Sequence, residues 1–374
     1  MTGSTSALLK RVAFIVNGGE QSAMGERAKS FRQLLAPKGE IDIYFSSRFR
    51  IVSFCRFLVG LVRTRPAIVY VFDMSLAGVL AAVLYKRLFK ASLIVETGDA
   101  IGELARSLDR PRWAIVLTDF LEALSVREAH RIVLRGSNHQ TYLAEKFPAL
   151  PLATDWVPDG VDTRQFAPSR EARSSLKPEF RDGLVVGLVG SSNWNPRLGI
   201  CAGWELVEML RITQGHRIVA MLVGGGSGVA TLKHRAIRYG IEERISFVGA
   251  VKHERLPEYI HMMDICISTQ TNDWVGRVRT TGKLPLYMAC GKFVLASNVG
   301  EAARVLPKEM LIDYEGTVDH GYPAKLAQRV LEIMRQPDIL ELGSLNRETA
   351  LRLFDYTVLS QRLWAVLSRS ARMP

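Results

Sequence analysis

One stretch of the chain, Asp273 to Lys292, gathers the residues with the clearest capacity for chemistry. Three of its cations and two hydroxyl residues lie close together in sequence: Arg277, Arg279, Lys283, Thr280 and Thr281. A helical pattern begins at Gly282, so unpaired backbone amides should lie beside these side chains. Cations, hydroxyl donors and helix-start amides together hold a diphosphate group. A solvated basic loop explains the stretch less well, because packing residues such as Trp274 lie at the same place.

Two further loops are rich in small residues. The first, Gly190 to Gly199, contains Ser191, Ser192 and Arg197 and should run into a helix near Leu198. Phosphate binding is one interpretation of it. An ordinary turn of the same composition is the other, and the sequence leaves both open.

The second loop, Val223 to Gly228, is similar to a compressed dinucleotide fingerprint. Such a fingerprint belongs after the first strand of a domain, whereas this loop follows a later one. A dehydrogenase is therefore disfavoured.

The elements that must position these loops alternate between short apolar runs and longer helical patterns. In the first half we expect strands at 11–16, 41–45, 67–72, 92–96, 131–134 and 152–157, and helices at 21–36, 49–63, 75–90, 113–129 and 138–147. The pattern restarts with a strand at 184–190 and five further strand and helix pairs. Repeated strand–helix units predict parallel sheets whose ligands bind at the carboxyl ends of the strands.

This organisation predicts an α/β chain with two doubly wound domains. We expect an N-terminal domain at 1–165, a linker at 166–183, a second domain at 184–344 and closing helices at 345–374 that pack back toward the N-terminal domain.

Composition narrows the partners and the compartment. The 374 residues include 49 Lys and Arg against 37 Asp and Glu, a net charge of +12 that indicates an anionic partner. Nucleic acid, phosphorylated small molecules and anionic lipid all meet that description. The four cysteines and seven histidines lack metal-ligand spacing, and the start of the chain lacks a signal-peptide pattern. We therefore expect a reduced, cytoplasmic protein without a metal.

A basic helical segment, Arg48 to Arg65, contains five arginines among apolar residues. Arg48, Arg56 and Arg63 fall within roughly 80° of one another on a helical wheel. Such a helix suits an anionic membrane surface and a lipid-linked acceptor. It is equally explained as a helix that packs on the sheet with its arginines in water.

The second half resembles the donor-binding domain of the GT-B glycosyltransferases, especially the retaining family 4 group. The segments that carry the resemblance are GKLPLYMACGKFVLASNVGEA (282–302), ISFVGAVKHERLPEYIHMMDICIST (245–269) and, at the hinge between the domains, VPDGVDTRQFAP (157–168). The first half is similar more faintly, in IVYVFDMSLAG (68–78) and LIVETGDA (93–100). The resemblance implies two Rossmann-like domains that face each other across a cleft, with a hinge near Asp159 to Phe166.

The resemblance also implies roles for particular residues. Lys283, with Arg277 and Arg279, would stabilise the donor diphosphate, and Asp99 would lie near the transferred sugar. The implied donor-binding residues are Ser191, Ser192, Arg197, Gly224, Val251, Thr280, Thr281 and Gly282. Gly18, Gly19 and Glu20, after the first strand, would face the acceptor and donor.

Two departures from the family pattern stand out. Val278 and Leu286 occupy the places of its paired glutamates, and Gly98 occupies the place of its active-site histidine. Leu286 cannot accept hydrogen bonds from ribose. Asp273 or Glu301 are candidates to compensate.

The function that the resemblance implies is metal-independent transfer of a sugar from a nucleotide-sugar to a lipid-linked or growing surface glycan, with retention of configuration. It implies a cytoplasmic enzyme at the inner face of the cell membrane, with nucleic acid excluded as a partner. A sugar-nucleotide epimerase on the same fold and an inactive glycan- or partner-binding subunit remain alternatives.

Overall fold

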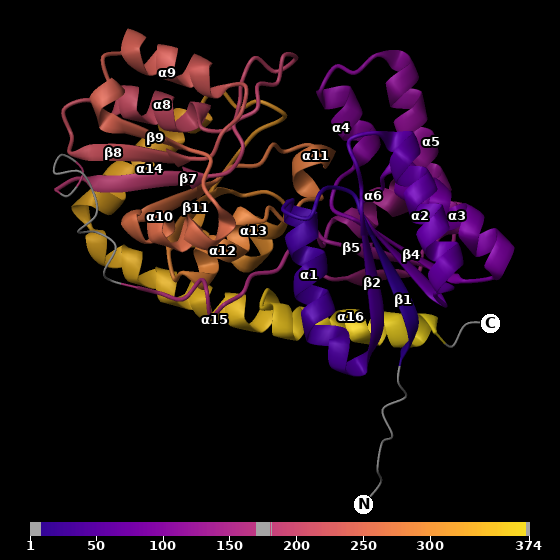
Figure 1. Ribbon diagram of the computed structural model, residues 1–374. Coiled ribbons are helices and arrows are strands. Elements are labelled where there is room, and N and C mark those ends of the chain that lie inside the picture. The colour runs from indigo at the N-terminus through magenta and orange to yellow at the C-terminus, as the bar shows by residue number, and fades with distance from the viewer. Residues whose placement is uncertain (1–8, 170–179, 181, 372–374) are drawn as a thin grey trace, which may run out of the picture. The chain divides into compact units, whose positions relative to one another are not determined.

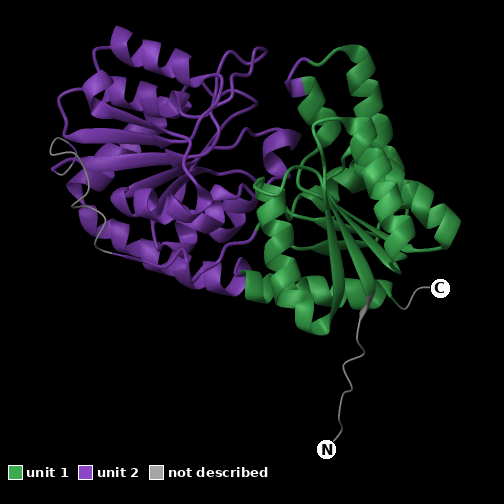
Figure 2. Cartoon of the chain, in the orientation of Figure 1, with its two compact units in different colours: residues 1–106, 110–159, 356–374 green, residues 107–109, 160–355 purple. Residues whose placement is uncertain are grey.

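The computed structural model describes residues 9–169, 180 and 182–371. Within it the chain forms two compact units (Figure 2). Unit 1 comprises residues 1–106, 110–159 and 356–374, and unit 2 comprises residues 107–109 and 160–355. Each unit is built on its own parallel sheet, as the alternating pattern predicts.

The sheet of unit 1 has six strands in the order β2-β1-β3-β4-β5-β6, all parallel (Figure 1). The strands are β1 (Leu9–Val16), β2 (Gly39–Phe45), β3 (Ile68–Phe72), β4 (Ser92–Thr97), β5 (Arg131–Leu134) and β6 (Thr154–Trp156). The helices of unit 1 are α1 (Ala23–Leu35), α2 (Arg50–Thr64), α3 (Leu76–Phe89), α4 (Ile101–Ser107), α5 (Arg112–Glu128), α6 (His139–Lys146) and α16 (Tyr356–Ser370), with the last residue of α4 assigned to unit 2. The strand order reverses between β1 and β3, and ligands of such sheets bind at that point.

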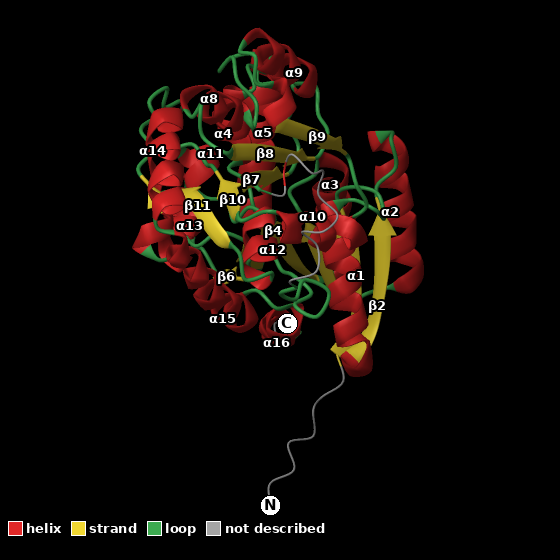
Figure 3. Ribbon diagram, turned by 90° about the vertical axis from the view of Figure 1, so that its left-hand side faces the viewer, coloured by secondary structure: helices red, strands yellow, loops and turns green. Residues whose placement is uncertain are grey.

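Helices cover both faces of this sheet. α1 contacts α16 on one face, and α2 packs against α3, which also contacts α5, on the other. Figure 3 shows β2 lying between α1 and α2. The core on the α1 side includes Phe14, Phe31, Tyr70 and, from α16, Leu363. Nearly every residue of β3 and β4 is buried, which is why both strands are continuous apolar runs without alternation.

Helix starts and ends in unit 1 follow local chemistry. Ser22 and Ser75 cap α1 and α3 by accepting hydrogen bonds from the backbone N–H of Gly25 and Gly78. At the other end, α2 and α3 terminate at Arg65 and Lys90, which adopt the left-handed conformation.

The sheet of unit 2 has the order β12-β11-β10-β7-β8-β9, again parallel. Its strands are β7 (Leu184–Val189), β8 (Ile218–Val223), β9 (Ile245–Gly249), β10 (Ile265–Ser268), β11 (Phe293–Ser297) and β12 (Leu311–Ile312). Its helices are α8 (Trp204–Ile212), α9 (Val229–Arg238), α10 (Leu256–Met262), α11 (Trp274–Arg277), α12 (Lys283–Ala289), α13 (Gly300–Val305), α14 (Tyr322–Arg335) and α15 (Gly343–Leu353). This order is the one found in dinucleotide-binding Rossmann folds, with its switch point between β7 and β10.

The structure changes several sequence expectations. The helix predicted from Leu198 begins instead at Trp204, because Asn195 and Ile200 form a bridge that encloses a turn at 196–199. A short helix, α4, lies in a stretch where none was predicted. The units divide at Gly160, and most of the expected linker at 166–183 lies outside the described residues.

The C-terminal helices also differ from expectation, because they separate. α15 packs on α12 within unit 2, whereas α16 belongs to unit 1 and contributes Leu359, Leu363 and Leu367 to its core. Tyr356 thus begins the return of the chain to unit 1.

Candidate active site

The carboxyl edge of the unit 2 sheet is built from closely packed glycine loops. Gly224 and Gly226 both have φ of 142°, and a Cβ on Gly224 would lie 1.9 Å from the carbonyl oxygen of Gly190. The Gly224 amide donates to Gly249, which ties the second loop to the end of β9. Only glycine allows backbone to approach backbone this closely in a left-handed conformation. The Gly224 loop, read as a compressed fingerprint, therefore has a packing role.

The first loop is fixed against the second through Ser192. Its amide donates to the Gly225 carbonyl at 2.8 Å, and its own carbonyl accepts from Gly228 at 2.8 Å. The Ser192 amide is thus already engaged, although it was expected to be available to phosphate. Ser192 Oγ is buried without a hydrogen-bond partner. Ser191 and Arg197 are exposed on the same loop.

Lys283, the first residue of α12, reaches this first loop. A Cβ on Gly190 would lie 3.8 Å from Lys283 Nζ, so the amine lies close to this glycine. Burial lowers the pKa of the Lys283 ammonium, the carboxylate of Glu205 opposes that shift, and Arg279 adds to it. The structure therefore brings together Lys283, Arg279 and the Gly190 loop.

Glu205 is an acid that sequence inspection missed. It is 2% exposed near the start of α8, and its Oε2 accepts a hydrogen bond from the Gly203 amide at 3.0 Å. Burial raises its pKa, while Thr269 and Lys283 act to lower it. The signal available in the sequence was an acid within the apolar helical pattern WELVEML. Glu205 supplies a buried counter-charge to Lys283.

The remaining polar residues of this stretch are divided between the loop and the interior. Thr280 is buried, Thr281 Oγ1 lies 3.2 Å from Ser268 Oγ, and Gly282 is exposed with open space where a side chain would stand. Arg277 differs from expectation. Its Nε donates to Asn272 Oδ1 at 2.8 Å and its guanidinium lies over Trp274, so Arg277 is engaged in local contacts of α11.

The expected base-binding position follows β9 at the same edge. A Cβ on Gly225 would lie 3.9 Å from the side chain of Ala250, and Val251 is partly buried beside it. Leu286, in contrast, points into the core of unit 2 and is 8% exposed. A carboxylate at this position would be desolvated.

Asp273 and Glu301, the candidates to replace the absent glutamate pair, both take part in local contacts. Asp273 caps α11 by accepting from the Gly276 amide, and it also accepts from Thr271 Oγ1 at 2.7 Å. Glu301 is buried and forms an ion pair with Arg304. Both carboxylates are committed to local structure.

In unit 1 the loop after β1 lies at the carboxyl edge of its own sheet. The Gly18 amide donates to Ser46 Oγ at 2.7 Å, which joins this loop to the end of β2. Gly19 and Glu20 are exposed. Gly25 in α1 has no room for a side chain, because a Cβ would lie 2.4 Å from the Glu20 carbonyl. The loop therefore rests directly on the first turn of α1.

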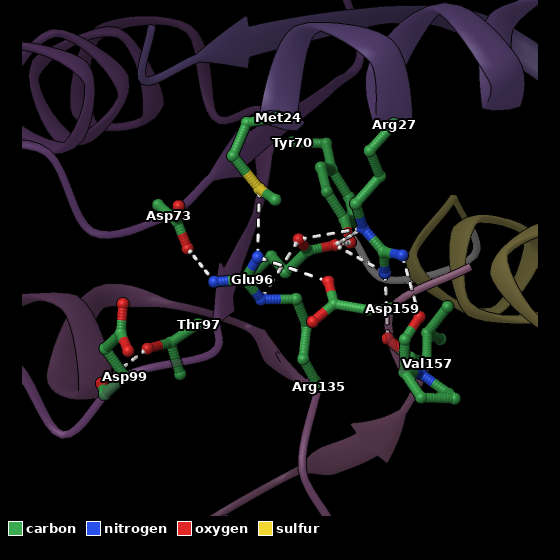
Figure 4. Close-up of polar contacts among 11 residues, drawn as sticks. Met24, Arg27, Tyr70, Asp73, Glu96, Thr97, Asp99, Arg135, Val157 and Asp159 are labelled. Atoms are coloured by element: carbon green, nitrogen blue, oxygen red, sulfur yellow. Dashed lines mark hydrogen bonds and ion pairs between the residues drawn. The ribbon is translucent and has the colours of Figure 1, made fainter. Parts of the chain in front are cut away.

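Behind this loop lies a buried charged network (Figure 4). Arg27, 1% exposed, pairs through Nε and Nη2 with both oxygens of Glu96, which is fully buried. Tyr70 donates to Glu96 at 2.5 Å, and Arg27 donates to the carbonyls of Val157 and Pro158. The pair thereby links α1 to β3, β4 and the segment after β6.

A second arginine, Arg135, continues the network from the end of β5. Its Nη2 lies 2.7 Å from Asp73 Oδ1, its Nη1 lies 3.4 Å from Asp159 Oδ1, and its Nε lies 4.0 Å from Glu96. A Cβ on Gly98 would lie 2.0 Å from Arg135 Nε. The guanidinium therefore fills the space that a side chain at position 98 would need, and this explains the absence of a histidine there.

In this network, burial and the neighbouring charges shift the pKa values of Asp73 and Arg135. Burial raises the pKa of Asp73 to about 6, against the opposing effect of Arg135. Burial would lower the pKa of Arg135, but Asp73 and Asp159 outweigh it and raise that pKa. Asp73 also has φ of 60°, a strained backbone for a residue other than glycine. Asp99, partly buried, accepts at its carbonyl from Thr97 Oγ1 at 3.0 Å.

Arg135, Asp73, Glu96 and Arg27 were not among the sequence candidates. Asp73 and Arg135 each directly follow a strand, at the edge where ligands of parallel sheets bind, and that position was the available signal. Glu96, an acid inside an apolar strand, was a second one. Their pairing depends on which strands lie adjacent.

Comparison with known proteins agrees with this geometry. Residues 183–336 match the family described as glycosyl transferases group 1. A GDP-mannose-dependent alpha-(1-6)-phosphatidylinositol monomannoside mannosyltransferase of Mycobacterium tuberculosis is 28% identical over 56% of this chain and 54% of its own length. A D-inositol 3-phosphate glycosyltransferase of Catenulispora acidiphila is 29% identical over 66% of this chain and 57% of its own length. The matches thus span little more than half of these relatives.

Solved structures extend the likeness to nearly the whole chain. A sucrose-phosphate synthase from Thermosynechococcus elongatus covers 96% of this chain, and 98% of its own chain is matched, with a TM-score of 0.76 and 16% identity. Anabaena HepE in complex with UDP covers 96% and is matched over 100%, with a TM-score of 0.74 and 15% identity. Both likenesses concern the fold. The whole chain therefore has the two-domain α/β fold of these GT-B structures, and the match to the glycosyl transferases group 1 family lies within unit 2.

Proposed function

We propose that this chain transfers a sugar from a nucleotide-sugar to a lipid-linked or growing surface-glycan acceptor, with retention of anomeric configuration as in family 4. The observation that carries the proposal is the Lys283 amine above Gly190, within the segment that matches the group 1 family. A partly desolvated ammonium at that place can stabilise negative charge that grows on a departing diphosphate.

In this proposal unit 2 binds the donor. Lys283 and Arg279 face the diphosphate, with Thr280, Thr281 and Gly282 beside them. In the first loop, the exposed Ser191 adds a hydrogen-bond donor and the exposed Arg197 adds a positive charge. Backbone groups at Ala250 and Val251 hold the base. The leaving phosphate takes the acceptor proton, so the carboxylates of unit 1 are not needed as a base.

Unit 1 binds the acceptor in this proposal. The partly buried Gly18 and the exposed Gly19 and Glu20 lie at the carboxyl edge, and Asp73 and Asp99 follow the ends of β3 and β4. Carboxylates there can accept hydrogen bonds from sugar or inositol hydroxyls. Several relatives bear names that include phosphatidylinositol or inositol phosphate, which supports a lipid-linked or phosphorylated acceptor.

We also propose that transfer needs no metal and takes place at the inner face of the cell membrane. Lys283, Arg279 and Arg197 provide the positive charge that a divalent cation would otherwise supply. The named relatives are transferases, so neither an epimerase nor an inactive subunit is favoured.

A donor and acceptor screen tests the proposal. The full chain is incubated with UDP- and GDP-sugars, each with phosphatidylinositol, inositol phosphate or a polyprenyl-linked sugar, and release of nucleoside diphosphate is measured with and without EDTA. We expect release that depends on one acceptor class and persists in EDTA, and NMR of the product should show the retained anomer. Turnover of donor without acceptor, or no diphosphate affinity, would overturn the proposal.

A further inference from the structure

The surface of unit 1 carries an apolar face that its own core does not explain. α2 buries Ser53, Phe57 and Leu61 toward the sheet. Its opposite side carries Ile51 and Val59, which are 79% and 66% exposed. Residues four and eight apart lie along one side of a helix, so these two belong to a single outward stripe. The outward side of α2 is therefore apolar, and not only basic as the sequence suggested.

The two neighbouring helices continue this stripe. α3 exposes Leu80, Leu84 and Leu88 at four-residue spacing, and α5 exposes Trp113, Val116 and Phe120. α3 contacts both α2 and α5, so the stripes lie on adjacent helices of one side of the sheet (Figure 1). We call this surface the three-helix face. Side chains this apolar, exposed on three adjacent helices, mark an interaction surface.

The charge on two of the three helices, α2 and α3, is one-sided. No Asp or Glu occurs at 43–72 or at 74–95, whereas these stretches contain eight Lys and Arg. Lys86 and Arg87 pair with Glu128, but no ion pair among the described residues engages the five arginines of the Arg48–Arg65 segment. Arg56 and Arg63 are seven residues apart, so they border the apolar stripe of α2 on the same side.

We propose that the three-helix face docks unit 1 on an anionic lipid surface. Apolar side chains enter the boundary between head groups and acyl chains, and the bordering arginines contact lipid phosphates. A second copy of the chain fits less well, because a two-fold interface would bring two copies of the same basic α2 and α3 surface together. Within the described residues, none of the helices combines the length and hydropathy needed to cross a bilayer, so contact would be at the surface.

The position of the three-helix face agrees with the proposed function. The role given to the face rests on that function. α2 begins four residues after Ser46, whose hydroxyl accepts from Gly18 in the loop assigned to the acceptor. A lipid-linked acceptor held at that loop would thus have its lipid beside the start of the face.

Vesicle flotation tests the proposal with the full chain. The probes are phosphatidylcholine vesicles, with and without one third phosphatidylglycerol. The apolar variant is Ile51→Ser/Val59→Ser/Leu88→Ser/Trp113→Ser. Its matched control replaces four exposed apolar residues of unit 2, Ile237→Ser/Met334→Ser/Leu345→Ser/Leu351→Ser. The charge variant is Arg56→Gln/Arg63→Gln, with Arg164→Gln/Arg352→Gln as its control.

We expect the wild type and both controls to float with the anionic vesicles, and to float poorly with phosphatidylcholine alone. The charge variant should lose roughly tenfold in vesicle partitioning, and the apolar variant at least that much. Circular dichroism checks that every variant is folded. Absence of wild-type flotation, or apolar variant flotation equal to that of its control, would overturn the proposal.

Two further outcomes separate this proposal from its alternatives. Dimerisation that the apolar variant abolishes, without vesicle binding, would assign the face to a second copy and overturn the proposal. Flotation without any transferase activity would sustain docking and contradict the proposed function. Transfer to a water-soluble acceptor without flotation would contradict docking and sustain the proposed function.

Discussion

The carboxyl edges of the two sheets achieve their local order by different means. In unit 2 the edge is mostly backbone, with Gly190, Gly224 and Gly226 in left-handed conformations and Lys283 above them. In unit 1 the edge is mostly buried charge, with Arg27 and Arg135 among three carboxylates. A glycine loop is recognisable from its own sequence, whereas a charge network depends on residues that are far apart in the chain.

The difference has a thermodynamic counterpart. Backbone loops tolerate a change of one surface side chain, because their hydrogen bonds do not depend on it. A buried ion pair does not, because removal of one partner leaves the other desolvated and uncompensated. Substitutions should therefore affect mainly stability at the unit 1 edge and mainly activity at the unit 2 edge.

The largest effect on stability is expected from Arg135→Met. The substitution leaves Asp73, Asp159 and Glu96 with one cation fewer, and it should lower the free energy of unfolding by about 3–5 kcal/mol. Chemical denaturation measures it. Arg255→Met, which breaks the exposed pair with Glu258, is the control and should leave stability nearly unchanged. Equal stability of the two variants would contradict the buried network.

For unit 2, Lys283→Ala should reduce kcat by roughly 10²–10³-fold while the fold is retained, because charge stabilisation at the leaving diphosphate is lost. Steady-state kinetics with the donor found by the screen, together with nucleoside diphosphate titration, measures the effect. Lys283→Arg should recover part of the rate, and the exposed Lys308→Ala should behave as wild type. Near-normal turnover of Lys283→Ala would remove the residue from the site.

An intermediate effect is expected where Gly98 meets Arg135. Gly98→Ala places a methyl group within the guanidinium and should cost about 1–3 kcal/mol of stability. In an Arg135→Ala background the same change should cost much less, because the space is vacated. Gly19→Ala, where a Cβ would meet nothing within 4 Å, serves as the control. Additive losses in this double-mutant cycle would show that the two residues do not compete for one space.

An effect of similar size concerns the pH dependence of stability. The pKa of Asp73 is raised to about 6 in the folded protein, so between about pH 4 and pH 6 the folded state keeps a proton that the unfolded state releases. This group therefore makes stability fall as pH rises through that window. Asparagine tolerates the left-handed backbone at this position. As the pH rises from 4 to 7, the free energy of unfolding of Asp73→Asn should increase by on the order of 1–3 kcal/mol relative to that of the wild type.

Unfolding curves for both proteins at several pH values test that expectation. Parallel pH profiles of wild type and Asp73→Asn would mean that Asp73 titrates normally.

The sequence by itself determined much of the architecture. Continuous apolar runs such as 68–72 predicted buried parallel strands, and their alternation with helical patterns predicted two α/β units. The Lys283 segment and the Gly-rich loops were identified because their residues are neighbours in the chain. Such patterns are local, and local patterns survive without knowledge of the partner elements.

Tertiary structure decided what local patterns could not. Arg277 was grouped with Lys283 by spacing, yet α11 directs it to Asn272 and Trp274. In the sequence, Gly98 is a departure from the family's active-site histidine. In the fold, Arg135, 37 positions away in the sequence, fills the space beside it. The apolar side of α2 became visible only when packing fixed which of its faces is buried. Charge pairing and exposure are properties of contacts between elements, and a sequence read along one strand or helix at a time does not contain them.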